Sequence, residues 1–333
     1  MPAKIAVVTG GTAGLGRAIV RELAERGWDV AILARGEDGL QGAAADVMRA
    51  GRRALPLSVD VADNDAVEAA AEQIERDLGE IDLWVNDAMA GVFGEFVTTE
   101  PRDFERAVQV NFFGFVNGTR AALTRMKPRN RGHIIQIGSA LAHRGIPLQA
   151  AYCASKHAIT GFTESVLTEL IHDKSAVRIS QVDMPAMNTV QFNWVKSQLP
   201  HHPQPVPTIF EPETCARAVA DVADSPRRRS WIGEPTVMTV LGNRFVAPFL
   251  DVYLAKTGYS GQQAPDKKDP MLPSNLYEPV AGDHGSRGIF SDKAKSTSPQ
   301  IWYTQHRTVS YVAAIGAAAA GVGALVAGLK KRA

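Results

Sequence analysis

The chain has 333 residues, of which 45% are hydrophobic and 21% charged, as expected for one large globular domain with an extension, or for two domains. Lys and Arg number 36 against 35 Asp and Glu, and this balance argues against a strong field for binding nucleic acid. Two cysteines, Cys153 and Cys215, exclude a disulfide framework and fit a reducing cytosol. A strand is expected to begin within the first few residues, which leaves no room for a signal peptide.

The first predicted unit is a strand, a glycine turn and a helix. Ile5 to Val8 form an apolar run typical of a buried strand, and a helix is expected over Arg17 to Arg26. Between them, Gly10 allows a tight turn, Gly14 lets a diphosphate approach the backbone, and Gly16 lets helix and strand pack closely. The helix N-terminus offers N–H groups and a positive dipole end to phosphates. The unit therefore predicts a dinucleotide site, with a ligand-free glycine turn as the alternative.

The second strand indicates which dinucleotide is used. It is expected over Asp29 to Leu33 and ends in Ala34-Arg35, with no carboxylate at its end to hold an adenosine ribose hydroxyl. Arg35 can instead meet a 2′-phosphate with a planar donor fork. The sequence therefore favours NADP(H), with NAD(H) possible. A solvent-facing arginine is the alternative interpretation.

Two further strands are predicted to end in polar turns. Ala54 to Val59 is followed by Asp60-Val61, where Asp60 is either a site residue or a cap for the next helix. Ile81 to Val85 is followed by Asn86-Asp87-Ala88-Met89. The carboxyl ends of strands in a doubly wound sheet are where such folds bind ligands.

The strongest chemical signal lies in the middle of the chain. A strand over Gly132 to Ile137 is expected to end at Gly138-Ser139, and thirteen residues later come Tyr152 and Lys156. Residues four apart share one face of a helix, so the phenol and the ammonium are expected to point the same way. Tyr-x-x-x-Lys alone is a weak signal. A serine at a strand end upstream and a glycine turn before it make the combination specific.

Together these motifs resemble the classical short-chain dehydrogenase/reductase family over about residues 4 to 257. The resemblance implies an α/β fold with a doubly wound parallel sheet (Rossmann fold) and a catalytic set of Asn111, Ser139, Tyr152 and Lys156. The cofactor contacts that it implies are Gly10, Thr12, Gly14, Leu15, Gly16, Arg35, Asp60, Val61, Asn86, Ala88, Tyr152, Lys156, Pro185 and Thr189. The chain departs from the family at Asp87 and Met89, where the family has Asn and Gly.

The expected activity is NADP(H)-dependent interconversion of a carbonyl and a secondary alcohol. Tyr152 is expected to transfer the proton, Lys156 to lower the pKa of the phenol, and Ser139 to hold the carbonyl oxygen. The resemblance gives Asn111 a place in the proton relay. A non-catalytic nucleotide-binding scaffold or sensor is the alternative. A hydrolase nucleophile at Ser139 is disfavoured, because no G-x-S-x-G surrounds it.

Beyond the catalytic motif, Val177 to Val182 is expected to be a strand that leads into Pro185 and Thr189. Phe192 to Phe210 is rich in proline and aromatic residues, and the resemblance makes it a substrate lid for a bulky apolar molecule. A variable surface loop is an equal alternative. No metal site is predicted, because the two histidines of this segment lack further ligands at useful spacing. A strand within 231–241 and a last core helix over 245–256 complete the domain.

The C-terminal part changes character. We expect a catalytic domain over 1–257, an extended linker over 258–307 and an apolar helix over 308–333. Tyr311 to Leu329 has no charge and is followed by three cations, and as a helix it would be about 28 Å long. A membrane anchor for a cytoplasmic domain is predicted, with a soluble helix packed on the enzyme or on a second subunit as the alternative. The resemblance implies a homodimer or homotetramer acting on a small-molecule substrate.

Overall fold

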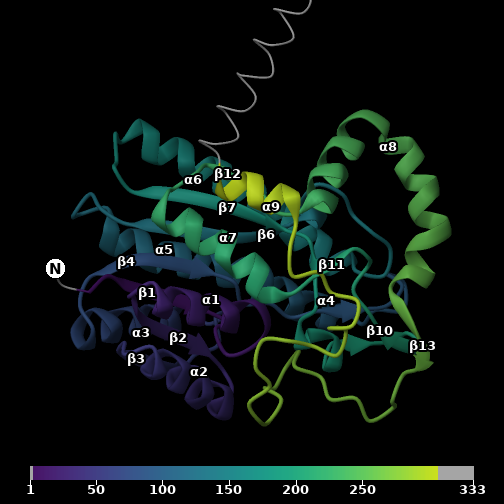
Figure 1. Cartoon of the computed structure of the whole chain (residues 1–333), viewed down its shortest axis with the longest axis horizontal. Helices are drawn as coiled ribbons and strands as arrows, with labels where there is room; N and C mark the ends of the chain where they lie inside the picture. Colours follow the sequence, from purple (N-terminus) through teal and green to yellow (C-terminus); the bar gives the residue numbers. More distant parts are fainter. Residues whose placement is uncertain (1–2, 307–333) are drawn as a thin grey trace, which may run out of the picture.

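The computed structural model describes residues 3–306 and is built on a seven-stranded parallel sheet in the order β12-β7-β6-β4-β1-β2-β3 (Figure 1). This confirms the predicted doubly wound α/β fold. The order reverses at β1, which pairs with β2 on one side and with β4 on the other, and a reversal of this kind opens a ligand crevice at the carboxyl edge. The strands are β1 (Ile5–Thr9), β2 (Asp29–Ala34), β3 (Ala54–Ser58), β4 (Ile81–Asn86), β6 (His133–Ser139), β7 (Arg178–Met184) and β12 (Arg229–Trp231).

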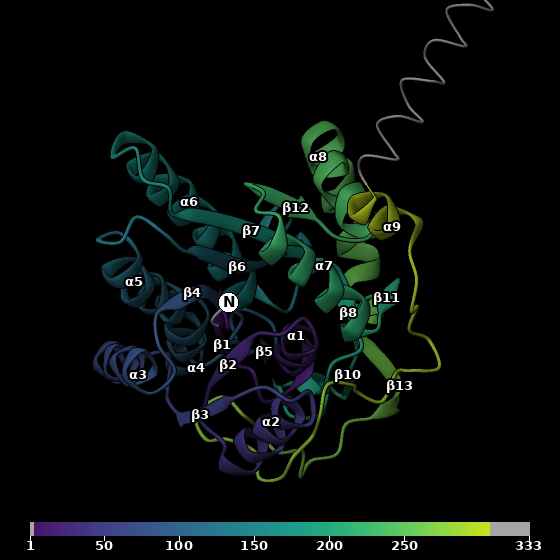
Figure 2. The same ribbon diagram turned by 60° about the vertical axis from the view of Figure 1, so that its left-hand side comes forward.

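Helices cover both faces of the sheet because successive strand residues point to opposite sides. Ala6 and Val8 pack in one core cluster, and Ile5 and Val7 pack in the other. Figure 2 shows the helices on the two sides of the sheet. The first face carries α1 (Gly14–Glu25), α2 (Glu37–Arg49) and α7 (Pro212–Asp224). The second carries α3 (Asn64–Asp77), α4 (Pro101–Val108), α5 (Gly114–Met126) and α6 (Ala150–His172).

Short strand pairs fold the segment after β7 onto the body of the molecule. Phe192, Leu199 and Ile209 from this segment form a third core cluster with Phe93 and Phe290. The segment predicted as a lid or a surface loop is therefore packed against the body of the molecule, and burial of its apolar side chains holds it there. The short strands are β5 (Val92–Phe93), β8 (Ala186–Met187), β9 (Lys196–Ser197), β10 (His201–Pro203), β11 (Ile209–Phe210) and β13 (Gln263–Lys267).

Helix α8 (Glu234–Gly261) corrects two predictions. The strand expected within 231–241 ends at Trp231, because Gly233 turns the chain with φ +80° and Pro235 lies in the first turn of the helix. The helix expected over 245–256 is not a core helix, since Phe245 and Phe249 are 74% and 66% exposed. Helix α8 as a whole is long and apolar enough to cross a membrane by length and composition, and its most apolar stretch is not buried. The helix is kinked at Val246, two residues before Pro248.

After β13 the chain runs without regular structure to α9 (Pro299–Gln305), passing in yellow-green below α1 and α8 in Figure 1. Leu276, Phe290 and Ile301 are buried and attach this segment to the three core clusters. The domain boundaries stay a prediction. The apolar helix predicted over 308–333, with its membrane anchor, lies outside the described residues.

Candidate active site

A continuous cavity of about 1220 Å³ lies at the carboxyl ends of β1, β2, β4, β6 and β7. It runs from the glycine turn after β1 to Tyr152 on α6. Several predicted site residues line it together: Gly10, Thr12, Gly14, Leu15, Arg35, Asp60, Val61, Ala88, Ser139, Tyr152, Lys156, Pro185 and Thr189. The switch point of the sheet therefore carries a cavity in which these residues lie together.

The glycine turn needs its glycines for space and for backbone conformation. Gly10 has φ +71°, and a Cβ there would lie 2.7 Å from the Cα of Ala88. A Cβ on Gly16 would lie 2.3 Å from the carbonyl oxygen of Gly10. The N-cap residue Ala13 offers no side-chain cap, and the Gly14 and Gly16 amides are held by the Gly285 carbonyl oxygen and the Asp87 carboxylate. The turn lines the cavity at the N-terminus of α1, where a helix end favours a diphosphate.

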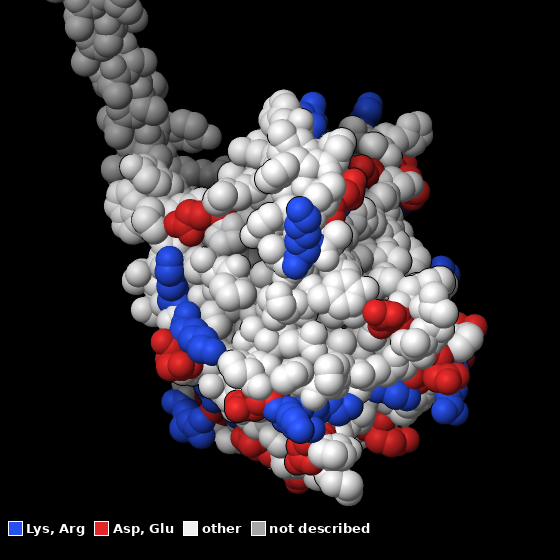
Figure 3. All heavy atoms as spheres, turned by 90° about the vertical axis from the view of Figure 1, so that its right-hand side faces the viewer, with Lys and Arg blue, Asp and Glu red and all other residues white. Residues whose placement is uncertain are grey.

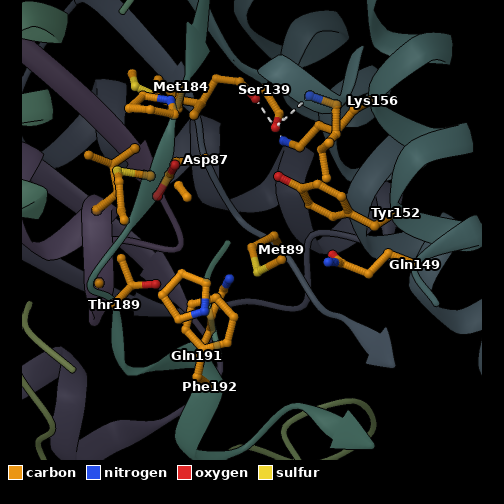
Figure 4. A pocket seen from close by; sticks show the side chains of 18 of the residues that line it. Asp87, Met89, Ser139, Gln149, Tyr152, Lys156, Met184, Thr189, Gln191 and Phe192 are labelled. Atoms are coloured by element: carbon orange, nitrogen blue, oxygen red, sulfur yellow. Dashed lines mark hydrogen bonds between the residues drawn. The ribbon is translucent and has the colours of Figure 1, made fainter. Parts of the chain in front are cut away.

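Asp87 places a carboxylate where the family has an amide. It accepts a hydrogen bond from the Gly16 amide at the start of α1. Burial raises the pKa of Asp87 to about 7, while the charge of Lys156 and the Gly16 hydrogen bond oppose this shift. Asp87 and Met89 both line the cavity, facing Tyr152 in Figure 4. The two departures from the family therefore lie at the centre of the site.

Ser139, Tyr152 and Lys156 meet at the end of β6, as Figure 4 shows. The Lys156 ammonium donates to the carbonyl oxygen of Ile137 at 2.7 Å, and its Nζ lies 5.5 Å from the centroid of the Tyr152 ring. Nζ also lies 4.7 Å from the centroid of the Phe115 ring. Burial lowers the pKa of Lys156 to about 8, against the raising effect of Asp87. The phenol, the ammonium and the serine hydroxyl thus lie together in one part of the cavity.

The pKa of Tyr152 moves opposite to our expectation. Burial raises the pKa of the phenol above its usual value, although a hydrogen bond with Ser139 acts to lower it. Lys156 is expected from the sequence to lower the pKa of this phenol. It does not set the direction of the pKa shift, because its ammonium is directed to the Ile137 carbonyl and lies over the ring. Tyr152 is therefore a protonated phenol at neutral pH, which is the form that donates a proton.

Asn111 and Asn86 lie behind the cavity and are not among its lining residues. The Asn111 side chain lies in a π-helical turn (Gln109–Phe113) and bonds both the amide and the carbonyl of Ala90 at 2.8 Å. Asn86 is fully buried, donates to Gln136 at 2.9 Å and accepts from the Trp84 indole at 2.9 Å. Asn111 thus fixes the turn that carries residues 87–90, and Asn86 ties the end of β4 to α5 and β6.

Arg35, Asp60 and Val61 line the end of the cavity beside β2 and β3, which we call the adenosine end because the resemblance places the adenosine there. The Arg35 guanidinium is half-buried and donates to backbone carbonyl oxygens of the C-terminal segment, at 2.7 Å for Tyr277 and also to Asn275. Asp60 forms an ion pair with Arg106 and accepts from the Ala62 amide, while Asp63 caps α3. Asp60 is thus not the cap of that helix.

Sequence reasoning missed a buried ion pair beside the glycine turn. Arg17 is 2% exposed and its Nε donates to Asp46 at 2.5 Å, while its Nη1 contacts Asp283 at 2.8 Å. The sequence held one signal of this pair. Arg17 is a basic residue at a core-facing position of α1, and Asp46 is an acidic residue at a core-facing position of α2. Asp283 lies 266 residues further along the chain than Arg17, and its sequence context gave no indication of the contact.

The other end of the cavity is mainly apolar and opens beside α8. Side chains from the end of β7, from the segment after it and from α8 form it: Met184, Met187, Val190, Phe192, Trp194, Met238, Leu250, Tyr253 and Leu254. In Figure 3 the face that carries α8 shows few charged side chains across its middle, and most of them gather along its lower edge. Within residues 3–306, no group of three or more His, Cys, Asp and Glu residues is arranged to hold a metal ion.

A parallel sheet with a phosphate cradle at its switch point, and a phenol and an ammonium in the same cavity, define an enzyme of the dinucleotide-dependent oxidoreductase class. Comparison with known proteins agrees, since a family model described as short chain dehydrogenase matches residues 4–199. The chain therefore belongs to the short-chain dehydrogenase family, and it is an oxidoreductase that uses a nicotinamide cofactor.

Individual relatives extend this comparison. The uncharacterized oxidoreductase YxnA of Bacillus subtilis (strain 168) is 29% identical over 315 residues, which cover 94% of this chain and 88% of that protein. A 3-oxoacyl-(acyl-carrier-protein) reductase of Bos taurus is 35% identical over 176 residues, 53% of this chain and 73% of that one. The crystal structure of a metagenomic short-chain oxidoreductase in complex with NADP matches with a TM-score of 0.57 and 29% identity, over 69% of this chain and 95% of that chain. The similarity to YxnA thus continues past residue 199.

Proposed function

We propose that this protein is an NADP(H)-dependent reductase/dehydrogenase that interconverts a carbonyl and a secondary alcohol on an apolar substrate. The observation that carries this proposal is the position of Tyr152, Lys156 and Ser139 in the same cavity as the glycine turn. The apolar end of that cavity, formed by residues such as Phe192 and Leu254, matches an apolar substrate. A hydrolase or a phosphoryl-transfer enzyme has no use for this set of groups.

The nicotinamide, when bound, supplies or accepts the hydride. Tyr152 carries its proton at neutral pH and can give it to the carbonyl oxygen as negative charge develops there. Ser139 can donate a hydrogen bond to the same oxygen, because its hydroxyl lies against the Tyr152 phenol. Lys156 stays beside the phenol ring and stabilises the phenolate that remains after transfer. Asn111 acts through the turn that it fixes.

Three features support NADP(H) over NAD(H). Arg35 directly follows β2. In NAD-binding folds a carboxylate at the end of this strand holds a ribose hydroxyl, and this chain has no carboxylate there. Arg35 lines the cavity, and its planar guanidinium, which donates to the Asn275 and Tyr277 carbonyl oxygens, would hold a 2′-phosphate once those contacts open. The metagenomic relative was solved with NADP. Titration of NADPH and NADH by fluorescence tests this preference, and equal affinities would contradict it.

The function is tested by following NADPH oxidation with a panel of steroid, fatty-acyl and aromatic ketones. Turnover of an apolar ketone, with little turnover of small polar ketones, supports the proposal. Tight NADPH binding without turnover of any carbonyl would favour the alternative of a nucleotide-binding scaffold or sensor, which the Asp87 and Met89 departures motivate. Absence of NADPH and NADH binding would overturn both interpretations.

We also propose contact with a membrane for a cytoplasmic catalytic domain that acts as a homodimer or homotetramer. The apolar stretch of residues 311–329 with its three following cations motivates the membrane contact. The exposed apolar side chains of α8, including Met238 and Phe249, add a second surface for it. Membrane fractionation with and without residues 308–333 tests the anchor, and gel filtration with light scattering tests the assembly.

A further inference from the structure

The C-terminal segment forms part of the wall of the cofactor half of the cavity. Residues 275–288, which we call the strap, cross from the adenosine end to the glycine turn. Of the strap, Asn275, Pro279, Val280, Gly282 and His284 line the cavity. The family match ends at residue 199, so this wall lies outside the part of the chain that defines the family.

The strap bonds directly to the phosphate cradle. The Gly14 amide, at the N-terminus of α1, donates to the carbonyl oxygen of Gly285 at 3.1 Å. A diphosphate that used this amide would have to displace the strap at that point. Two residues away, the Asp283 carboxylate accepts from both Nη atoms of Arg17, at 2.8 and 3.3 Å. Because Arg17 is also held by Asp46, its guanidinium is a fixed anchor point for the strap.

The strap also holds the adenosine end. Its carbonyl oxygens at Asn275 and Tyr277 accept from Arg35, the residue that we expect at the 2′-phosphate. Further along, the Gly282 amide donates to Asp38 at 2.8 Å. A Cβ on Gly36, the residue before α2, would lie 3.3 Å from the Cβ of Pro279, so the strap passes close to the start of this helix. The strap therefore covers this half of the cavity through contacts with α1 and α2.

On the side away from the glycine turn, the strap contacts the segment that follows β7. The Asn275 amide donates to the carbonyl oxygen of Trp194 at 3.0 Å, and the His284 ring packs edge-on to the Trp194 ring at 4.8 Å. The Gly288 amide donates to the carbonyl of Asn188 at 3.1 Å. Strap and predicted lid thus enclose the cavity together.

The strap has fixed ends and an exposed middle. Leu276 is fully buried and Phe290 is 6% exposed, so both ends are held by core packing. Most residues from 277 to 285 are exposed, and Gly282 and Gly285 have positive φ, where glycine meets no steric penalty. Opening the middle breaks its polar contacts, including those of Ser286 and Arg287 with Glu213, and leaves the two apolar anchors in place.

We propose that the strap retains the bound dinucleotide, and that its middle must open between Leu276 and Phe290 to admit or release the cofactor. The inference rests on the proposed function, because it needs a dinucleotide in this cavity. The strap contacts with Arg17 and Asp38 then limit cofactor exchange. Its contacts with the Gly14 amide and with Arg35 break when the diphosphate and the 2′-phosphate bind there. The strap is a positioning and retaining element, and it takes no part in the chemical step.

A reversible cross-link tests the proposal. In the double variant Gly36→Cys/Pro279→Cys, the two Cβ atoms lie near the separation that a disulfide needs. The native Cys153 and Cys215 are buried, so mild oxidation is directed to the new pair. NADPH fluorescence is followed after oxidation of the unloaded protein, and after loading, oxidation and dilution. The same variant reduced with dithiothreitol is the matched control.

We expect the oxidised protein to take up NADPH, and to release it once loaded, at least about tenfold more slowly than the reduced protein. Equal exchange rates in the oxidised and reduced forms would overturn the strap proposal and leave the proposed function intact. If the wild-type protein binds neither NADPH nor NADH, the proposed function fails and the strap proposal fails with it.

A second variant needs no cross-link. Asp283→Asn weakens the contact with Arg17, and we expect NADPH to dissociate about three- to tenfold faster. Asp292→Asn changes an exposed aspartate just beyond the strap and serves as the control. Unchanged dissociation from the Asp283 variant, with the Asp292 variant also unchanged, would contradict the proposed latch.

Discussion

The Nζ atom of Lys156 lies 5.5 Å from the centroid of the Tyr152 ring, one helical turn away on α6. Both side chains point from the same face of the helix into the cavity at the end of β6. The spacing of four residues sets this relationship, but burial sets its electrostatics. The phenol has a raised pKa and the ammonium a lowered one.

The first prediction concerns Tyr152→Phe. The change removes the proton donor and keeps the ring, so we expect ketone reduction to fall by about 10²- to 10⁴-fold while NADPH affinity stays within about twofold. Stopped-flow oxidation of NADPH and a fluorescence titration measure the two quantities. Retained turnover would remove Tyr152 from the mechanism.

The second prediction concerns Asp87→Asn, which restores the family residue. The Asp87 carboxylate acts to raise the pKa of Lys156, so its loss should lower that pKa further below about 8. If the protonated ammonium supports turnover, activity falls as pH rises through the Lys156 pKa. The alkaline limb of the kcat/KM profile should therefore move to lower pH in this variant. An unmoved alkaline limb, with the protein still folded, would show that the two groups do not interact in the working enzyme.

The third prediction concerns the pH dependence of stability. Burial lowers the pKa of His133 to about 4, against 6.5 as the ordinary value. Between these values the unfolded chain binds more protons than the folded one, so stability falls as pH decreases from 6.5 to 4. The loss attributable to His133 approaches about 3 kcal/mol. Urea unfolding at several pH values measures it. His133→Gln should flatten this acid slope, and His172→Gln, on the exposed end of α6, should leave it unchanged.

The fourth prediction concerns Asp46→Ala. The Asp46 carboxylate accepts from Arg17 and Arg21, both at 2.5 Å, and is itself 2% exposed at the side chain. Its removal leaves the buried Arg17 guanidinium with only the 41% exposed Asp283 as an ion-pair partner, at a cost of about 3 kcal/mol, the lower end of the range for breaking a buried pair. We expect a clear fall in the free energy of unfolding. Glu72→Ala, at an exposed position of α3, is the control and should stay within about 0.5 kcal/mol of the wild type. Equal stability of the two variants would contradict the buried pair.

Sequence determined the local parts of this protein. The apolar runs at Ile5 and Ile81, the spacing of the glycines and the interval from Tyr152 to Lys156 each act over a few residues, and periodicity and sterics are enough to interpret them. They predicted the parallel sheet, the edge of the sheet that carries the site and the residues that meet there. The Asn111 amide, by contrast, is used by the backbone of Ala90, which no local pattern indicates.

Tertiary structure alone decided which distant segments complete the site. Asp283 meets Arg17 across 266 residues of chain, and Gly285 takes the amide of Gly14, because a polar segment without periodicity carries no signal of where it docks. The exposure of α8 was hidden for the opposite reason, since an apolar helix looks the same in sequence whether it is buried or exposed. Burial also reversed the pKa shift expected for Tyr152, because desolvation depends on everything packed around the phenol and not on its neighbour one turn away.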